Sequence, residues 1–238
     1  SNVYVTWVGF YQKYSPQSAV FFRRSMDSGA SFEPEQIFAL GPVNTPELAA
    51  NDNKVYMAAV HHLDPNSYNS EIVFRHSMDG GVNWNPPLTE PPLNISETPA
   101  QSDLPHLDFG DNKLYLFWAD SASNVNFEPF NVLFRYSTDN GITWDKPLGQ
   151  QALNLSARIN DYTPPHIVVS GQTIAAAWHN QAIPLTTTDI LFRSSVDGGI
   201  SWDPALGVSA TYISSNSGSS IRPQVALSLP YFHIAWTD

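Results

Sequence analysis

Side chains capable of binding or acid–base chemistry gather in the polar segments that separate the apolar stretches of this chain. Carboxylates such as Asp64, Asp120, Glu128 and Asp161 could supply the acid and base of a glycoside hydrolase, although no spacing selects one pair. Aromatic rings with polar neighbours could instead stack on sugar rings or anchor a protein partner. The candidate ligand-binding residues are Tyr11, Tyr14, His61, His62, Tyr68, Phe127, Arg158, His179 and Arg222.

The elements that must position these side chains follow from a repeated motif. Ser-x-Asp-x-Gly-x-x-Trp occurs three times, and a fourth copy carries Phe32 at the last position. The Asp residues are 52, 60 and 58 positions apart, a period typical of a repeated supersecondary unit. The motif residues are Ser25, Asp27 and Gly29; Ser77, Asp79, Gly81 and Trp84; Ser137, Asp139, Gly141 and Trp144; and Ser195, Asp197, Gly199 and Trp202.

Four strands recur around each motif, and we denote them A to D. Strand A follows a Pro, strand B alternates and usually ends in Trp, strand C ends in Phe-Arg before the motif, and strand D follows the motif. The predicted A strands are 46–50, 105–109, 165–169 and 223–227; the B strands are 3–7, 55–59, 114–118, 174–178 and 232–236; the C strands are 20–23, 72–75, 132–135 and 190–193.

This pattern predicts an all-β chain with almost no helix. Each unit is a four-stranded antiparallel meander of the length of a propeller blade, and the motif lies in its C–D hairpin. There the Asp can accept backbone N–H groups across the turn, the Gly can take a positive φ, and the aromatic ring can pack back on the blade.

We expect a single β-propeller, or a propeller segment, over residues 1–238, with approximate repeats 1–50, 51–110, 111–170 and 171–238. The strands amount to four full repeats plus an extra B strand, so both ends present unpaired sheet edges. Two interpretations remain open. The chain belongs to a longer array or is completed by another chain, including a second copy, or strand A from the C-terminal end closes four blades and displaces one B strand.

The four motifs resemble the Asp-box, or bacterial neuraminidase repeat (BNR), of the sialidase-like β-propellers. The resemblance implies that the box is a structural turn, found in enzymes and binding proteins alike. The arginines that end each C strand, which are Arg23, Arg75, Arg135 and Arg193, are accordingly interpreted as structural. A sialidase would add three substrate-binding arginines, yet outside these four only Arg24, Arg158 and Arg222 remain, and the family's Phe/Tyr-Arg-Ile/Leu-Pro signature is absent.

A meander places the A–B turns and the Asp boxes at one end of each blade and the long, dissimilar B–C loops at the other. The leading hypothesis is a non-catalytic, exported propeller that binds glycan or protein through the loop-rich B–C and D–A face. One alternative is a structural subunit or fragment of a larger surface assembly. The other is a sialidase-like glycoside hydrolase, and the sequence leaves enzymatic activity open while favouring binding.

The residue after each strand-A Pro is polar, so these residues are predicted to line a central channel: Glu47, His106, His166 and Gln224. Two imidazoles and a carboxylate could bind a metal, but their separation around a ring favours water-lined walls. No cofactor is expected. Asp-rich A–B turns such as Asn51-Asp52-Asn53 could bind Ca²⁺, but they lack an EF-hand spacing and are interpreted as solvated hairpins.

The composition of the chain argues against some classes of binding partner. A net charge of −11 argues against a nucleic-acid partner, whose binding requires clustered Lys and Arg. The sequence contains no Cys and no apolar run long enough for a membrane-spanning helix. Two candidate N-glycosylation sites, Asn94 and Asn154, occupy equivalent repeat positions. We therefore expect an extracellular or cell-surface location.

Overall fold

The computed structural model describes residues 1–11, 17–62, 69–98, 101–121, 130–156, 165–180, 188–215 and 218–238. These residues form 17 β-strands and no helix, which confirms the all-β prediction. The strands lie in sheets of three, four, four, four and two strands, so the A, B, C and D types occur in the predicted numbers. The chain divides into two compact units, Ser1–Leu107 and Asp108–Asp238.

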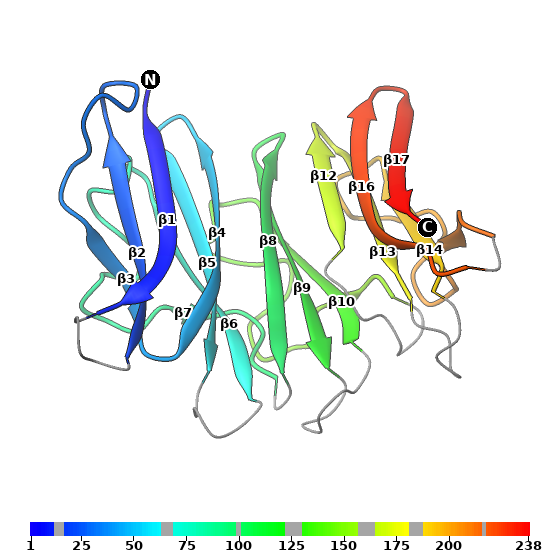
Figure 1. Ribbon diagram of the computed structural model, residues 1–238, viewed down its shortest axis with the longest axis horizontal. Coiled ribbons are helices and arrows are strands. Elements are labelled where there is room, and N and C mark those ends of the chain that lie inside the picture. The colour runs from blue at the N-terminus through cyan, green and yellow to red at the C-terminus, as the bar shows by residue number, and fades with distance from the viewer. Residues whose placement is uncertain are drawn as a thin grey trace. The chain divides into compact units, whose positions relative to one another are not determined.

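The first unit contains two sheets, β1-β2-β3 and β4-β5-β6-β7 (Figure 1). Its core lies between them, because side chains of β2, β3, β5 and β6 pack into one buried cluster together with Trp84. The strands are β1 (Val3–Phe10), β2 (Ser18–Ser25), β3 (Gln36–Leu40), β4 (Val43–Asn51), β5 (Lys54–His62), β6 (Ser70–Ser77) and β7 (Leu93–Asn94).

Strand β8 (Ser102–Gly110) crosses the boundary between the units, and the second unit contains the remaining strands. The sheets are β8-β9-β10-β11, β12-β13-β14-β15 and the two-stranded β16-β17. Buried clusters fill the spaces between consecutive sheets of this unit. The strands are β9 (Lys113–Ser121), β10 (Phe130–Ser137), β11 (Leu153–Asn154), β12 (His166–Ser170), β13 (Thr173–His179), β14 (Ile190–Ser195), β15 (Thr211–Tyr212), β16 (Ile221–Ser228) and β17 (Tyr231–Thr237).

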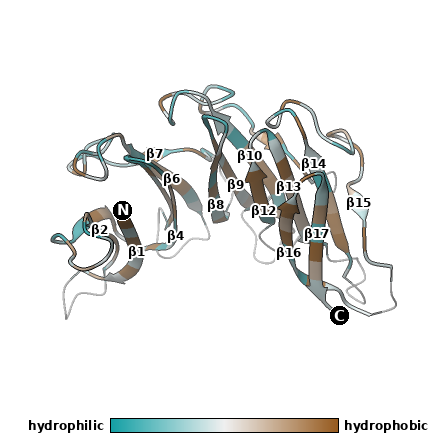
Figure 2. Ribbon diagram, turned by 90° about the horizontal axis from the view of Figure 1, so that it is seen from above, coloured by the Kyte–Doolittle hydropathy of each residue, from teal (hydrophilic) through white to brown (hydrophobic). Residues whose placement is uncertain are grey.

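The B strands β5, β9 and β13 are buried on both faces. Every residue from Val55 to Val60 is fully buried, although successive side chains point to opposite faces of a strand. This explains their nearly continuous apolar sequences. In contrast, exposed and partly buried residues alternate along β17. Figure 2 shows hydrophobic residues concentrated on the strands and hydrophilic residues on the connections.

The A strands differ from the prediction at their beginning. Strands β4 and β16 begin before the Pro rather than at it, and one extra residue shifts their register against the neighbouring B strand. The residue before the Pro takes a left-handed φ in three of these strands, at Thr45 (41°), Leu104 (55°) and Arg222 (55°). Because Pro has no N–H to donate, a bulge accommodates it within a strand. The bulge brings the residue two positions before the Pro into the strand.

The Asp boxes close the C–D hairpins through side-chain hydrogen bonds. In the second box Asp79 Oδ1 accepts the N–H groups of Val82 (3.1 Å) and Asn83 (2.9 Å) and the hydroxyl of Ser77 (2.8 Å). Hydrogen bonds, first from the Ser31 hydroxyl and then from Ser25 and the Ser31 N–H, lower the pKa of Asp27 to about 2, and the Ser201 hydroxyl and N–H do the same for Asp197. Trp84 packs edge-to-face on Phe22 of the preceding sheet, with ring centroids 5.0 Å apart. The aromatic ring therefore joins two sheets, whereas the sequence suggested packing on its own blade.

The repeated arginines donate to backbone carbonyls, and three of the four are buried. Arg75, Arg135 and Arg193 are at most 1% exposed. Arg75 donates to the carbonyls of Phe38 (3.1 Å), Pro86 (2.6 Å), Pro87 (2.6 Å) and Glu90. Burial lowers the pKa of Arg75 to about 10. Each guanidinium thus holds the irregular segment after its Asp box against the C strand.

Candidate functional site

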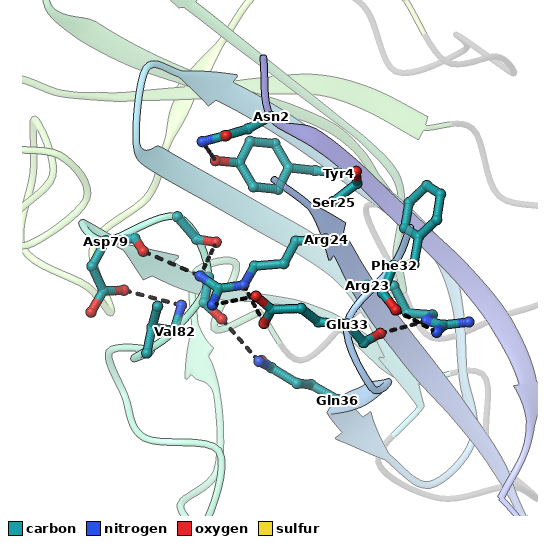
Figure 3. A network of polar contacts seen from close by, with 12 residues as sticks. Asn2, Tyr4, Arg23, Arg24, Ser25, Phe32, Glu33, Gln36, Asp79 and Val82 are labelled. Carbon is teal, nitrogen blue, oxygen red and sulfur yellow. Dashed lines mark hydrogen bonds and ion pairs between the residues drawn. The ribbon is translucent and has the colours of Figure 1, made fainter. Parts of the chain in front are cut away.

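The Asp boxes and the A–B turns lie at the same end of the sheets. Gly80 of the second box donates its N–H to the carbonyl of Asn53 (2.7 Å) in an A–B turn, and Gly198 donates to Gln172 (2.8 Å). These backbone hydrogen bonds at this end of the sheets stabilise the fold. In Figure 3, Arg24 lies between Glu33 and the second Asp-box hairpin, with an ion pair of 2.8 Å to Glu33 and a bond of 3.0 Å to the carbonyl of Gly80.

A polar cluster lies at the opposite end of the first unit. We call Asn44, His62, Gln101 and Asp103 the His62 cluster. A hydrogen bond of 3.1 Å joins Asn44 Nδ2 to His62 Nε2, and the Thr45 hydroxyl donates to Asn44 Oδ1 at 3.0 Å. Asp103 interacts electrostatically with His62 and accepts a side-chain hydrogen bond from Gln101. Residues from β4, β5 and β8 therefore converge at this end of the unit.

Burial changes the proton affinities at this end of the unit. It raises the pKa of Asp103 above its ordinary value, although the Leu104 N–H and His62 act in the opposite direction. Burial alone raises the pKa of Glu47, on the same strand as Asn44. Burial and the neighbouring His62 lower the pKa of His61. Titratable groups with shifted pKa values are typical of functional sites.

In the second unit the predicted residues mainly contact the backbone. His166 and His179 accept N–H groups of β16 through Nδ1, at 3.0 Å and 3.4 Å. Arg222 and Gln224 are exposed on β16, and the Gln224 amide donates to the carbonyl of Pro223. His106, in the first unit, is half-buried on β8. That Glu47, His106, His166 and Gln224 line one channel stays a prediction.

Several candidate residues lie outside the described part of the chain. These are Tyr14, Tyr68, Phe127 and Arg158, together with the loop carboxylates Asp64, Glu128 and Asp161. Tyr11 is described and is 42% exposed at the start of a B–C loop. Its N–H donates to the carbonyl of Gln17 at 3.0 Å.

The Asn and Ser residues of the two glycosylation sequons contribute to the fold. Ser96 Oγ and Ser156 Oγ accept N–H groups of the adjacent C strands, at 2.9 Å and 3.0 Å. Asn154 Nδ2, the atom that would carry a glycan, donates to Asn131 Oδ1 at 3.2 Å. Ser214 makes the same backbone contact in a blade without a sequon. The Ser residues thus have a structural explanation, and glycosylation stays a prediction.

Within the described ranges, no three His, Asp or Glu side chains are grouped as a metal ion would require. The same ranges include no helix that is long and apolar enough to cross a membrane.

Sequence reasoning missed Asn44, Gln101 and Asp103, because the A strands were predicted to start at the Pro. The signal that could have found Asn44 and Asp103 is a polar residue two positions before a strand-A Pro, present in both 44–46 and 103–105. Only the observed bulge shows that this position belongs to the strand and faces the end of β5.

Comparison with known proteins agrees with this architecture. Residues 135–146 match the BNR/Asp-box repeat family model. A search of curated protein sequences gives no match. The described sheets all follow the same meander order. The matched segment is therefore one copy of the unit that is repeated along the chain.

Solved β-propeller enzymes resemble the fold at low sequence identity. An α-L-arabinofuranosidase from Fusarium graminearum is 14% identical, with a TM-score of 0.58, over 96% of this chain and 64% of the enzyme. An α-L-arabinanase from Penicillium chrysogenum, solved with arabinobiose, is 15% identical, with a TM-score of 0.54, over 94% of this chain and 67% of the enzyme.

A sialidase from Trypanosoma rangeli, solved with sialic acid, is 13% identical, with a TM-score of 0.51, over 84% of this chain and 35% of the sialidase. The chain thus spans about two thirds or less of the length of these enzymes. It carries the Asp-box repeat and has the fold of the sialidase-like β-propellers.

Proposed function

We propose that this protein binds a carbohydrate at the end of its sheets that carries the B–C and D–A loops. The His62 cluster forms part of this binding surface. The observation that supports the proposal most is the convergence of amide groups, an imidazole and a carboxylate at the starts of β4 and β8 and the end of β5. Sugar hydroxyls both donate and accept hydrogen bonds, so such a mixed set suits them. The carbohydrates of the structurally similar enzymes, arabinobiose and sialic acid, provide the first ligands to test.

The cluster is also positioned before a ligand arrives. Asn44 is held at both ends of its amide, by Thr45 and by His62, and Asp103 is held by its neighbours. Groups that are already fixed lose little conformational entropy on binding. A protein ligand with polar surface groups remains the alternative partner, and protein pull-down assays would reveal it.

Binding is expected to weaken when cluster side chains are shortened. Calorimetric titration with arabino-oligosaccharides and sialyl-oligosaccharides would measure Kd for the unchanged chain, His62→Ala and Asn44→Ala. One lost hydrogen bond contributes about 0.5–1.5 kcal/mol, so each variant should bind roughly 2-fold to 13-fold more weakly. The control is His233→Ala, which removes an exposed imidazole on β17. Equal affinities in all four proteins would place the binding surface elsewhere.

Glycoside hydrolysis is the second candidate function, favoured by the two carboxyl groups whose pKa values burial raises, Glu47 and Asp103. A carboxyl group with a raised pKa can remain protonated near neutral pH and act as a general acid. Glu47 lies at the end of the bulge in β4, and Asp103 lies on β8 next to Leu104, which has a left-handed φ.

If the protein is a hydrolase, Asp103→Asn or Glu47→Gln should lower kcat by roughly 10²-fold or more on chromogenic α-L-arabinofuranosides or sialosides. Glu35→Gln, at an exposed position, should leave kcat unchanged. An absence of turnover by the unchanged chain across both substrate types would leave carbohydrate binding as the function.

A further inference from the structure

Two histidines of the second unit accept hydrogen bonds from the backbone of one strand, β16. His166 Nδ1, at the start of β12, accepts the N–H of Val225 at 3.0 Å. His179 Nδ1, at the end of β13, accepts the N–H of Arg222 at 3.4 Å. A ring nitrogen can accept a hydrogen bond only while it carries no proton. Both contacts therefore require a neutral imidazole with its proton on Nε2.

We propose that the β16–β17 hairpin is an acid-sensitive element, released from β12 and β13 when His166 and His179 become protonated. Protonation turns each Nδ1 acceptor into a donor that faces another donor, the backbone N–H. Because both bonds act on β16, the hairpin loses its two imidazole contacts together. The N–H groups affected belong to Arg222, inside the bulged segment between Ile221 and Gln224, and to Val225, directly after it.

Burial explains why protonation opposes docking of the hairpin. It lowers the pKa of His166, and burial together with the Arg222 guanidinium lowers the pKa of His179. The docked state consequently binds fewer protons than the open state below the ordinary His pKa of about 6.5. Docking is fully stable above that pH and loses stability as the pH falls from there toward the lowered pKa values.

Other charged or titratable groups lie on the elements around these imidazoles. They are Asp108 on β8, Asp189 before β14 and Arg193 on it, Tyr212 on β15, Arg222 on β16, Tyr231 and His233 on β17, and Asp238 after it. Arg222 acts on His179, while the low pKa of His166 results from burial. Asp108 Oδ2 instead accepts the N–H of Val169 at 3.0 Å.

Two contacts limit how far the hairpin opens. Apolar side chains of β16 and β17, including Val225, Phe232 and Trp236, pack against β13 and β14. Ahead of the hairpin, Ser220 donates its N–H to the carbonyl of Thr188 at 2.8 Å and accepts the Thr188 hydroxyl at 2.9 Å. Opening at acid pH is therefore local to the hairpin.

Hydrogen exchange measured by mass spectrometry at about pH 7.5 and about pH 5.5, corrected for intrinsic exchange rates, tests this proposal. Peptides covering 221–237 should lose roughly ten-fold of their protection at the lower pH, while peptides of β9 and β10 keep theirs. In His166→Asn/His179→Asn, Asn Oδ1 replaces Nδ1 as an acceptor that does not titrate. This variant should keep its protection at both pH values.

His233→Asn is the matched control, since it removes a titrating but exposed histidine from the same hairpin. It should respond to acid as the unchanged chain does. Each single variant, His166→Asn and His179→Asn, should show a smaller acid response and remains measurable if the double variant does not fold. Equal protection of the unchanged hairpin at both pH values, or an acid response that survives both Asn substitutions, would overturn the proposal.

Discussion

Replacing Arg193 by Leu is expected to destabilise the protein by about 3–5 kcal/mol. Arg193 is fully buried and donates to the carbonyls of Pro204, Ala205 (2.6 Å) and Val208 (2.6 Å). Leu fills part of the space but cannot donate, so three carbonyls in the segment after the Asp box lose their donor. An unpaired buried polar group typically costs about 1–3 kcal/mol. Urea unfolding followed by tryptophan fluorescence would measure the loss from the shift in midpoint.

Arg222→Leu is the matched control for this substitution. Arg222 is exposed, and its φ of 55° equals that of Leu104 at the same position of another A strand, so the backbone accepts Leu there. The same change of residue type should cost no more than about 0.5 kcal/mol. If both variants lost the same stability, the carbonyl contacts of the repeated arginines would not be a major source of stability.

Gly199→Ala should have the second large effect, a loss of roughly 2–5 kcal/mol. Gly199 in the fourth Asp box has a φ of +86°, and a Cβ atom there would lie 2.7 Å from Cζ of Phe134. Phe134 cannot yield easily, because it is fully buried and packs on Phe117 and Trp202 at centroid distances of 4.7 Å and 5.4 Å. The substitution therefore adds a steric clash to the strain of a left-handed φ.

Gly207→Ala separates these two effects. Gly207 has a φ of +87°, but a Cβ atom there meets nothing within 4 Å. It should cost only the conformational strain, roughly 1–2 kcal/mol. Thermal and urea unfolding of both variants would show the difference, which measures how tightly the Asp-box hairpin packs on the preceding sheet. Equal losses would mean that Phe134 can move aside.

The sequence predicted the repeat unit well because local chemistry specifies it. Asp79 bonds to groups only three and four residues away, and Arg75 to carbonyls 11 to 15 residues ahead in the same unit. Such contacts recur at constant spacing, so a motif search finds them. The apolar B strands were equally clear, since burial on both faces leaves little choice of residue type.

The candidate site was predicted only in part. His61 and His62 were selected from their loop position, but their neighbours Asn44 and Asp103 were missed. These two residues are 59 positions apart in the chain, and each precedes a residue with a left-handed φ, Thr45 or Leu104. Nothing in the residue types before a Pro requires this conformation, and general preferences for residues before Pro disfavour helical conformations.

By itself the sequence determined the all-β meander, the position of the four Asp boxes in their hairpins and the structural role of the buried arginines, because short-range hydrogen bonds and strand periodicity depend on nearby residues. Tertiary structure alone decided that Trp84 joins two sheets, that Asn44 and Asp103 meet His62, and that His166 and His179 hold β16. These contacts depend on how one blade packs against the next. Residues far apart in the chain supply both sides of each contact, and no local pattern encodes their meeting.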